Sequence, residues 1–357
     1  MKHHAVILLT AASTAAALYM GALRAHAAAA PEIDSTAFLG DHYPPRRTSF
    51  PDGVASYADV VYETIPGFRP VTLDLYLPPS ASRAGKNAAD KPLVIYIHGG
   101  GWQSGHSRQS GAFDDFPSVL ASIAARGYVV ASLNYRLSGE APFPAAIRDV
   151  KFAIKWLRAH AAEYGINKDK AVVWGGSAGG QLTALAATTC GVQELEPVLP
   201  NPASTEAAAT AGESDCVQGA VTWYGIFDFA AIPQSQLVTP ATPGSLPSAV
   251  VRYLGCSSAP CSTQTIRLAS AVSFVKAETP PFLLIHGAGD KTVDPAQSTL
   301  FRDALQKAGG QVDLLMIPAV DHSFIGATPE ATRDASLEAL RRTVQFIDAT
   351  VGHSATK

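Results

Sequence analysis

Ser177 is a candidate nucleophile because it lies in a Gly-x-Ser-x-Gly sequence between a predicted strand and a predicted helix. The apolar stretch 170–174 precedes this sequence, and a helical pattern begins near Gly180. A serine on such a tight turn presents its Oγ beyond the end of the sheet, and side chains at the flanking glycines would collide across the turn. The five-residue pattern alone is weak evidence, so the remaining parts of an acyl-transfer site must be identified elsewhere in the chain.

A glycine-rich turn upstream offers donors for the oxyanion that forms when a serine attacks a carbonyl. The apolar strand 93–97 runs into the sequence His-Gly-Gly-Gly-Trp at 98–102. Backbone N–H groups of such a turn can approach a developing negative charge closely, because no Cβ stands in the way. We expect the N–H groups of Gly100, Gly101 and Ala178 to bind the oxyanion. The alternative is a flexible turn without chemistry.

Where a nucleophilic serine is presented on such a strand-to-helix turn, the acid and then the histidine follow it along the chain. His322 comes shortly after the last predicted strand, 312–317, and is expected to act first as base and then as acid. Asp294 stands directly before a proline and three residues before a glutamine, as helix N-caps do. Asp290 has no such structural role and is the predicted acid. Asp321 is a poor candidate, because side chains adjacent in sequence to His322 diverge from it.

Three aromatic residues are candidates for the substrate pocket. Trp102 ends the glycine-rich turn, and Trp223 and Tyr224 end the predicted strand 220–224. Such rings would line an acyl or aromatic subsite, although core packing explains the last two equally well.

The composition limits the classes of protein that fit. The 357 residues are 47% hydrophobic with a formal net charge of −3, so there is no basic patch of the kind that binds nucleic acid. Residues 1–27 begin with a basic stretch, continue with an Ala-rich apolar run and end in Ala-His-Ala. This pattern predicts a cleaved signal peptide, export to the periplasm or medium, and no stable membrane association afterwards. A membrane anchor is the alternative.

Four cysteines, Cys190, Cys216, Cys256 and Cys261, suit an oxidising compartment. They allow three connectivities, of which we favour Cys190 with Cys216 and Cys256 with Cys261. No Cys-x-x-Cys or paired-histidine spacing accompanies them, so no metal is expected.

The pattern along the chain alternates strands with helices, which predicts an α/β domain with a mainly parallel eight-stranded sheet and helices on both faces. The domain is expected over 53–352, after an irregular tether at 28–52. The clearest helix has apolar residues at steps of three and four over 147–161. The predicted strands are 60–65, 72–77, 93–97, 128–134, 171–174, 220–224, 282–286 and 312–317.

Two segments interrupt this alternation. Residues 191–216 are of low complexity and are expected to form a surface insertion tied at its base by a cysteine pair. Residues 230–275 contain Pro, Ser and Gly turns around a short apolar run. They are interpreted either as a small cap over the carboxyl edge of the sheet, where α/β proteins bind ligands, or as a decorative loop.

Six motifs follow one another along the chain: His98–Trp102, Asn134–Leu137, Phe143–Ala145, Trp174–Gly180, Pro280–Gly287 and Asp321–Phe324. In these motifs and their order the chain resembles the α/β-hydrolase carboxylesterases of the hormone-sensitive-lipase-like type, nearest the bacterial feruloyl/acetylxylan esterase-like group. The resemblance implies Ser177, Asp290 and His322 as a catalytic triad. Many lipase-like relatives carry an acidic residue before the serine, where this chain has Gly176.

The expected function is that of an exported serine carboxylesterase that needs no metal or organic cofactor. Its substrates would be small-acyl or aromatic-acyl esters, of acetyl or feruloyl type, either small molecules or linked to a polysaccharide. A peptidase, lactonase or formamidase could use the same residues. A non-catalytic binding protein on a hydrolase scaffold is a further alternative.

Overall fold

The computed structural model describes residues 46–79, 91–198, 205–233, 248–256 and 260–352. The predicted signal peptide, 1–27, and most of the predicted tether lie outside these ranges. Among the described residues, no helix combines the length and the apolar character needed to cross a membrane.

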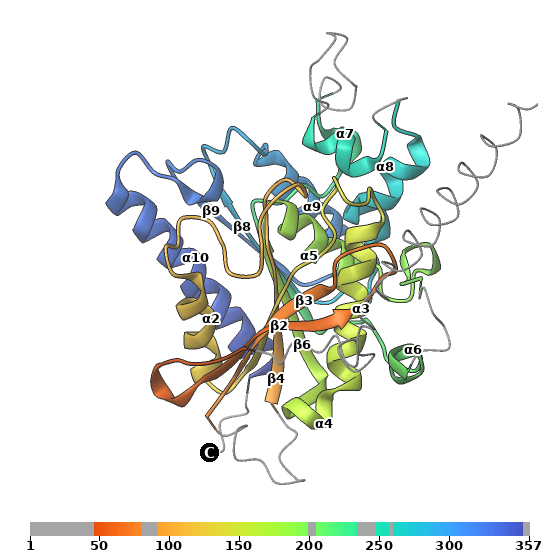
Figure 1. Ribbon diagram of the computed structural model, residues 1–357. Coiled ribbons are helices and arrows are strands. Elements are labelled where there is room, and N and C mark those ends of the chain that lie inside the picture. The colour runs from red at the N-terminus through yellow and green to blue at the C-terminus, as the bar shows by residue number, and fades with distance from the viewer. Residues whose placement is uncertain (1–45, 80–90, 199–204, 234–247, 257–259, 353–357) are drawn as a thin grey trace, which may run out of the picture. The chain divides into compact units, whose positions relative to one another are not determined.

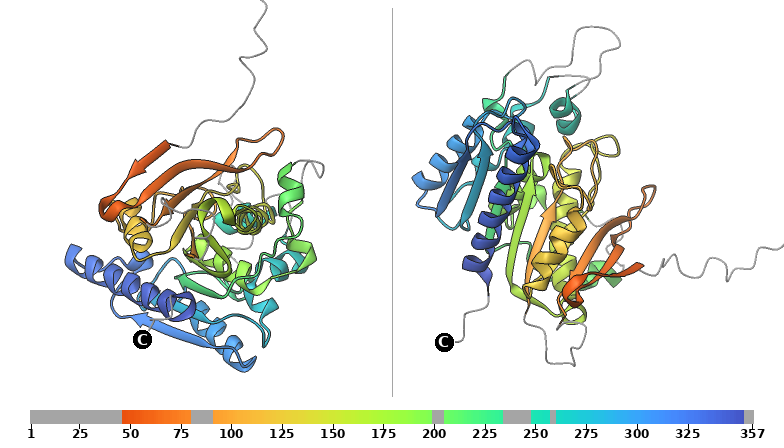
Figure 2. Two further views of the ribbon diagram at one scale, coloured as in Figure 1. Left: turned by 90° about the horizontal axis from the view of Figure 1, so that it is seen from below. Right: turned by 90° about the vertical axis from the view of Figure 1, so that its left-hand side faces the viewer.

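Within these ranges nine strands form one sheet, in the order β1-β2-β3-β5-β4-β6-β7-β8-β9. The pairs β1–β2, β2–β3 and β3–β5 are antiparallel. The remaining neighbouring strands, from β5 to β9 in the sheet order, pair in parallel. Figure 2 shows the two edges, with β1 and β2 on one side and β9 on the other. The strands are β1 (Arg46–Ser49), β2 (Ala55–Glu63), β3 (Val71–Leu77), β4 (Lys91–Ile97), β5 (Val129–Leu133), β6 (Ile166–Gly176), β7 (Gly219–Trp223), β8 (Phe282–Gly287) and β9 (Val312–Ile317).

All eight predicted strands are present, and the fold class is confirmed. The prediction of eight strands was wrong by one, because β1 lies in the stretch 28–52 that was expected to be irregular. Its residues, Arg-Arg-Thr-Ser, are all exposed and carry no apolar pattern. The strand exists because its backbone pairs with β2, and this pairing cannot be predicted from the pattern of apolar and polar side chains.

Helices cover both faces of the sheet, as predicted. The side chains of β4 alternate between two cores, with Leu93, Ile95 and Ile97 facing one and Val94 and Tyr96 the other. Helices α3, α5 and α9 pack on the first core, and α2 and α10 on the second (Figure 1). The helices are α2 (Phe116–Ala125), α3 (Ala145–Ala159), α4 (Ala161–Tyr164), α5 (Ala178–Thr188), α6 (Thr205–Thr210), α7 (Ala249–Leu254), α8 (Thr263–Ala269), α9 (Ala296–Lys307) and α10 (Pro329–Val351).

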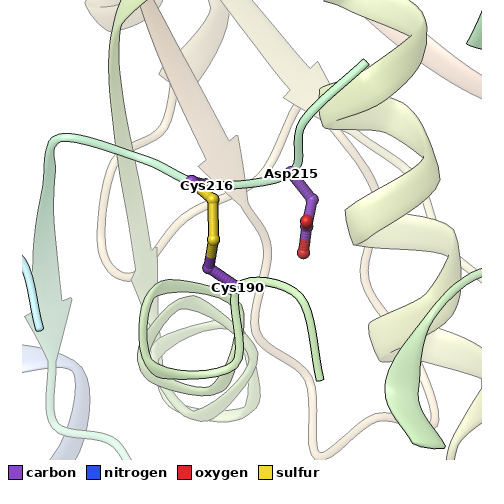
Figure 3. Close-up of side chains that lie close together, drawn as sticks. All are labelled: Cys190, Asp215 and Cys216. Atoms are coloured by element: carbon purple, nitrogen blue, oxygen red, sulfur yellow. A yellow bond between two sulfur atoms is a disulfide. The ribbon is translucent and has the colours of Figure 1, made fainter. Parts of the chain in front are cut away.

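The cysteines pair as favoured from the sequence, Cys190 with Cys216 and Cys256 with Cys261. The carboxylate of Asp215 lies beside the first pair, and the three possible ligand atoms of Cys190, Asp215 and Cys216 are within 4.8 Å of one another (Figure 3). They do not form a metal site in this state, because the two sulfur atoms are bonded to each other and metal ligation requires thiolates.

The insertion 191–216 is attached to α3 as well as through its disulfide. Lys151 is fully buried, and its Nζ forms ion pairs with Glu196 at 2.8 Å and Asp215 at 2.9 Å. Arg158, two turns further along α3, donates to two carbonyl oxygens at the end of the insertion. Since a buried cation requires close partners, these contacts fix the described parts of the segment against the domain.

The described parts of the segment 230–275 contain the short helices α7 and α8, at the top of Figure 1. Residues 234–247 and 257–259 of this segment lie outside the described ranges. The ring of Tyr253, on α7, stacks on that of Trp102 with centroids 4.3 Å apart. The segment therefore packs on the loop that follows the carboxyl end of β4.

Glu63, at the end of β2, is a buried carboxyl group with an unpaired oxygen. Its Oε2 has no hydrogen-bond partner among the described residues. Burial raises the pKa of Glu63 to about 8, with the nearby Asp149 adding to the effect and Arg136 opposing it. Between the unfolded-state pKa of about 4.3 and this value, the folded protein binds one more proton than the unfolded chain. Its stability therefore falls as the pH rises through this window.

We predict that Glu63→Gln removes this loss of folding stability with rising pH, because glutamine does not titrate. Wild type and variant should have similar stability near pH 4.5, and the variant should become the more stable protein by up to about 1.4 kcal/mol per pH unit towards pH 8. Urea unfolding at several pH values measures the difference. Glu163→Gln, at an exposed position on α4, is the control. A constant difference between wild type and Glu63→Gln across this range would contradict the prediction.

Candidate functional site

Ser177 occupies the sharp turn between β6 and α5, where the sequence placed it. Its backbone has φ 55° and ψ −122°, a conformation that L-residues rarely adopt, and its N–H donates to Trp223 O at 2.8 Å. The expected need for glycines is confirmed. A Cβ on Gly179 would lie 2.0 Å from the carbonyl oxygen of Ile97, and one on Gly175 would lie 2.5 Å from that of Gly179. The turn can therefore pack against β4 only with glycine at both positions.

A chain of hydrogen bonds joins Ser177 to the predicted histidine and acid. His322 Nε2 lies 2.9 Å from Ser177 Oγ, and His322 Nδ1 lies 2.8 Å from Asp290 Oδ2. His322 follows β9 and Asp290 follows β8, so the carboxyl ends of parallel strands bring the three side chains together. In this arrangement the imidazole can take the serine proton and the carboxylate can stabilise the resulting imidazolium.

Asp290 is held as a charged, oriented acceptor. Its Oδ1 accepts the N–H groups of Thr292 and Val293 at 2.8 and 2.9 Å, and His286 Nε2 lies 3.2 Å from Oδ2. Burial alone would raise the pKa of Asp290, but the hydrogen bonds from His286, His322 and Val293 outweigh it and hold the pKa well below its usual value. The carboxyl group is therefore ionised throughout the neutral range.

The two other aspartates have structural roles, which the sequence suggested for Asp294 at the start of α9 but not for Asp321. Asp294 accepts the N–H of Ala296, the first residue of α9, at 2.9 Å. Asp321 accepts the N–H groups of Lys291 and His322 at 2.8 and 2.7 Å, so it joins the two loops that carry the acid and the base.

The predicted oxyanion donors lie at the same end of the sheet. Gly100 and Gly101 have φ of 106° and 59°, in the region that favours glycine, and a Cβ on Gly100 would lie 2.2 Å from the carbonyl oxygen of Ser104. Ala178 is the first residue of α5, so its N–H has no partner within the helix. In the described part of the chain, no backbone acceptor is found for these three N–H groups. They can donate to an anion bound in front of Ser177.

A cavity of about 410 Å³ opens at these residues. Among the described residues, its lining combines glycines with hydroxyl, amide and imidazole groups and includes no aliphatic side chain larger than threonine. The lining residues are Tyr96, His98, Gly99, Gly100, Gly101, Ser104, Gly105, Gln109, Ser110, Gly111, Gly176, Ser177, Tyr224, Thr292, His322 and Ser323.

Of the three predicted pocket aromatics, only Tyr224 lines this cavity, and the prediction was wrong for the other two. Trp102 is turned away, and its indole stacks on Tyr253. Trp223 points into the core, where its Nε1 donates to Thr343 at 3.0 Å. β7 ends at Trp223, and Tyr224 follows it with a positive φ of 39°, so the strand pattern did not indicate which of the two rings would line the cavity.

Tyr224 supports the base directly. Its ring meets the His322 imidazole edge to face with centroids 4.7 Å apart. A Cβ on Gly176 would lie 3.1 Å from the same ring. A side chain before the serine would require the Tyr224 ring to shift by a few tenths of an ångström, so the glycine at this position suits the packing of Tyr224.

Sequence patterns missed the rest of the lining, notably Tyr96, Gln109 and Ser110. Tyr96 lies within the predicted strand 93–97, and the loop 103–115 contains no motif. The site-facing role of these residues depends on how that loop folds back. Arg108 fixes the loop by bonding Asp74 of β3 at 2.7 and 2.9 Å.

The sheet with its flanking helices has the α/β-hydrolase fold, and comparisons with known proteins give the family. Residues 73–305 match the BD-FAE family model, and the chain belongs to that family. Esterase LipQ of Mycobacterium tuberculosis is 33% identical over 272 residues, which cover 76% of this chain and 58% of LipQ. The chain spans about half the length of the first curated relatives that it matches, between 49% and 58%.

Solved structures agree on the fold. A truncated carbohydrate esterase from gut microbiota has a TM-score of 0.66 at 24% identity, covering 85% of this chain and 99% of that one. Esterase 2 of the planctomycete Thermogutta terrifontis, with butyrate bound, has a TM-score of 0.61 at 26% identity, covering 83% and 95%.

The different positions of Asp290 and Asp294 yield a prediction. Asp290→Asn should lower kcat for hydrolysis of p-nitrophenyl acetate by about 10³- to 10⁴-fold, because an amide no longer stabilises the imidazolium. Asp294→Asn should retain nearly full activity, since asparagine also caps a helix. Initial rates near neutral pH measure both. A larger loss from Asp294→Asn than from Asp290→Asn would mean that the acid has been misassigned.

Proposed function

We propose that this protein hydrolyses carboxylic esters through an acyl-enzyme formed on Ser177. The observation that carries the proposal is the continuous hydrogen-bond chain from Ser177 through His322 to Asp290, which opens onto a cavity lined by Gly100 and Gly101.

In the first half-reaction, His322 Nε2 accepts the Ser177 proton as Oγ attacks the ester carbonyl. The N–H groups of Gly100, Gly101 and Ala178 stabilise the negative charge on the carbonyl oxygen. The imidazolium then protonates the leaving alcohol, and the acyl group stays on the serine. In the second half-reaction, His322 removes a proton from water, and attack by that water releases the acid.

We propose that the preferred substrates join a small acyl group, of acetyl type, to a polar alcohol such as a sugar hydroxyl. The lining supports this choice, because Ser104, Gln109 and Ser110 offer hydrogen bonds and the part of the cavity wall that the structure describes has no large aliphatic side chain to receive a long acyl chain. A feruloyl group is the second candidate, since Tyr96 and Tyr224 supply ring surfaces in the same cavity.

We also propose that the protein is exported. Two disulfides join its four cysteines, and such bonds persist in oxidising compartments. The leader expected at 1–27 would direct that export.

An ester panel tests the substrate proposal. We predict that kcat/KM for p-nitrophenyl acetate exceeds that for the decanoate by about tenfold or more, because the longer chain has no apolar wall to bury against. Acetate release from acetylated xylan and hydrolysis of methyl ferulate separate the two substrate types. Ser177→Ala is the control and should lose activity by at least about 10³-fold. Preference for the decanoate, or for a peptide or lactone, would overturn the substrate assignment.

A further inference from the structure

Gln181 lies on α5, one turn after Ser177, and has no place in the mechanism above. Its side chain is fully buried, and both of its polar atoms are hydrogen-bonded. Oε1 accepts the indole N–H of Trp102 at 3.0 Å and the hydroxyl of Tyr253 at 3.2 Å, and Nε2 donates to the carbonyl oxygen of Ala269 at 2.9 Å. One amide thus connects the helix of the nucleophile to three separate segments.

The contact with Trp102 bears on the oxyanion donors. Trp102 follows Gly101 directly and has φ 57°, which is costly for a residue with a large side chain. Surrounding contacts must hold such a conformation in place. The indole is stacked on Tyr253 and bonded to Gln181, and the Trp102 carbonyl accepts the N–H of Ser138 at 2.7 Å.

We propose that Gln181 is a positioning residue for the oxyanion turn. By fixing the Trp102 ring, it sets the N–H of Gly101 relative to Ser177, since Gln181 and the serine stand on one rigid turn of backbone. Gln181 does not line the cavity and touches no substrate there. Its effect passes through Trp102, and Tyr253 and Ala269 extend the connection to α7 and α8.

The chemistry of the partners explains why an amide is needed. Trp102 and Tyr253 offer donors, whereas Ala269 offers an acceptor. A carboxylate would have no proton for Ala269, and an apolar side chain would leave all three groups buried and unpaired. The amide supplies both the acceptor for Trp102 and Tyr253 and the donor for Ala269.

The inference rests on the proposed function, and kinetics on p-nitrophenyl acetate test it. Gln181→Met fills a similar volume, and Trp102→Phe keeps a ring on Tyr253, while each removes the bond between the two residues. Each should lower kcat by about tenfold or more and leave KM within about threefold, because oxyanion donors act in the transition state. The double variant should be no worse than the poorer single variant by more than about twofold, since the residues act as a unit.

Thr188→Val is the matched control. It changes a buried polar residue of the same helix whose hydroxyl bonds only within α5, to Ala184 O and Leu185 O, and it should leave kcat unchanged. Circular dichroism establishes folding of each variant, and if Gln181→Met does not fold, Trp102→Phe decides alone. A kcat within about twofold of wild type, or losses that multiply in the double variant, would overturn the inference. Inactive wild-type protein would instead overturn the proposed function, so the two failures are distinct.

Discussion

The close approach of two backbones, that of β4 at its carboxyl end and that of the turn around Ser177, is the constraint on which the site depends. Gly179 fits against the carbonyl oxygen of Ile97 with no room for a side chain. This contact places the start of α5 beside the turn 98–102, so that donors from two segments face one space. The strained serine conformation is maintained by the same packing.

Polar contacts around the Ser177 turn fix the other site residues relative to the serine. His322 and Asp290 arrive from the ends of β9 and β8, and their loops are joined by Asp321. On the other side, Gln181 joins α5 to Trp102 and to the short helices α7 and α8. The reacting groups are thus few, and a larger set of buried polar contacts determines their geometry.

The sequence was informative where a local pattern requires a local structure. Ser177, His322 and Asp290 could be assigned because chain order and strand ends dictate their positions, and Asp294 could be set aside by its capping pattern. Features that depend on tertiary contacts were missed. β1 forms through backbone pairing alone, Trp102 turns away through its positive φ, and Trp223 points into the core. Gln109 and Ser110 reach the cavity only through the path of a loop without a motif.

The central claim is that Ser177 is the nucleophile, activated by His322 within this cavity. A fluorophosphonate probe reacts with an activated serine and leaves a stable adduct, which peptide mass spectrometry locates. The account predicts one adduct per chain, on Ser177, and none in Ser177→Ala. Labelling at another serine, or no labelling of the folded wild-type protein, would contradict it.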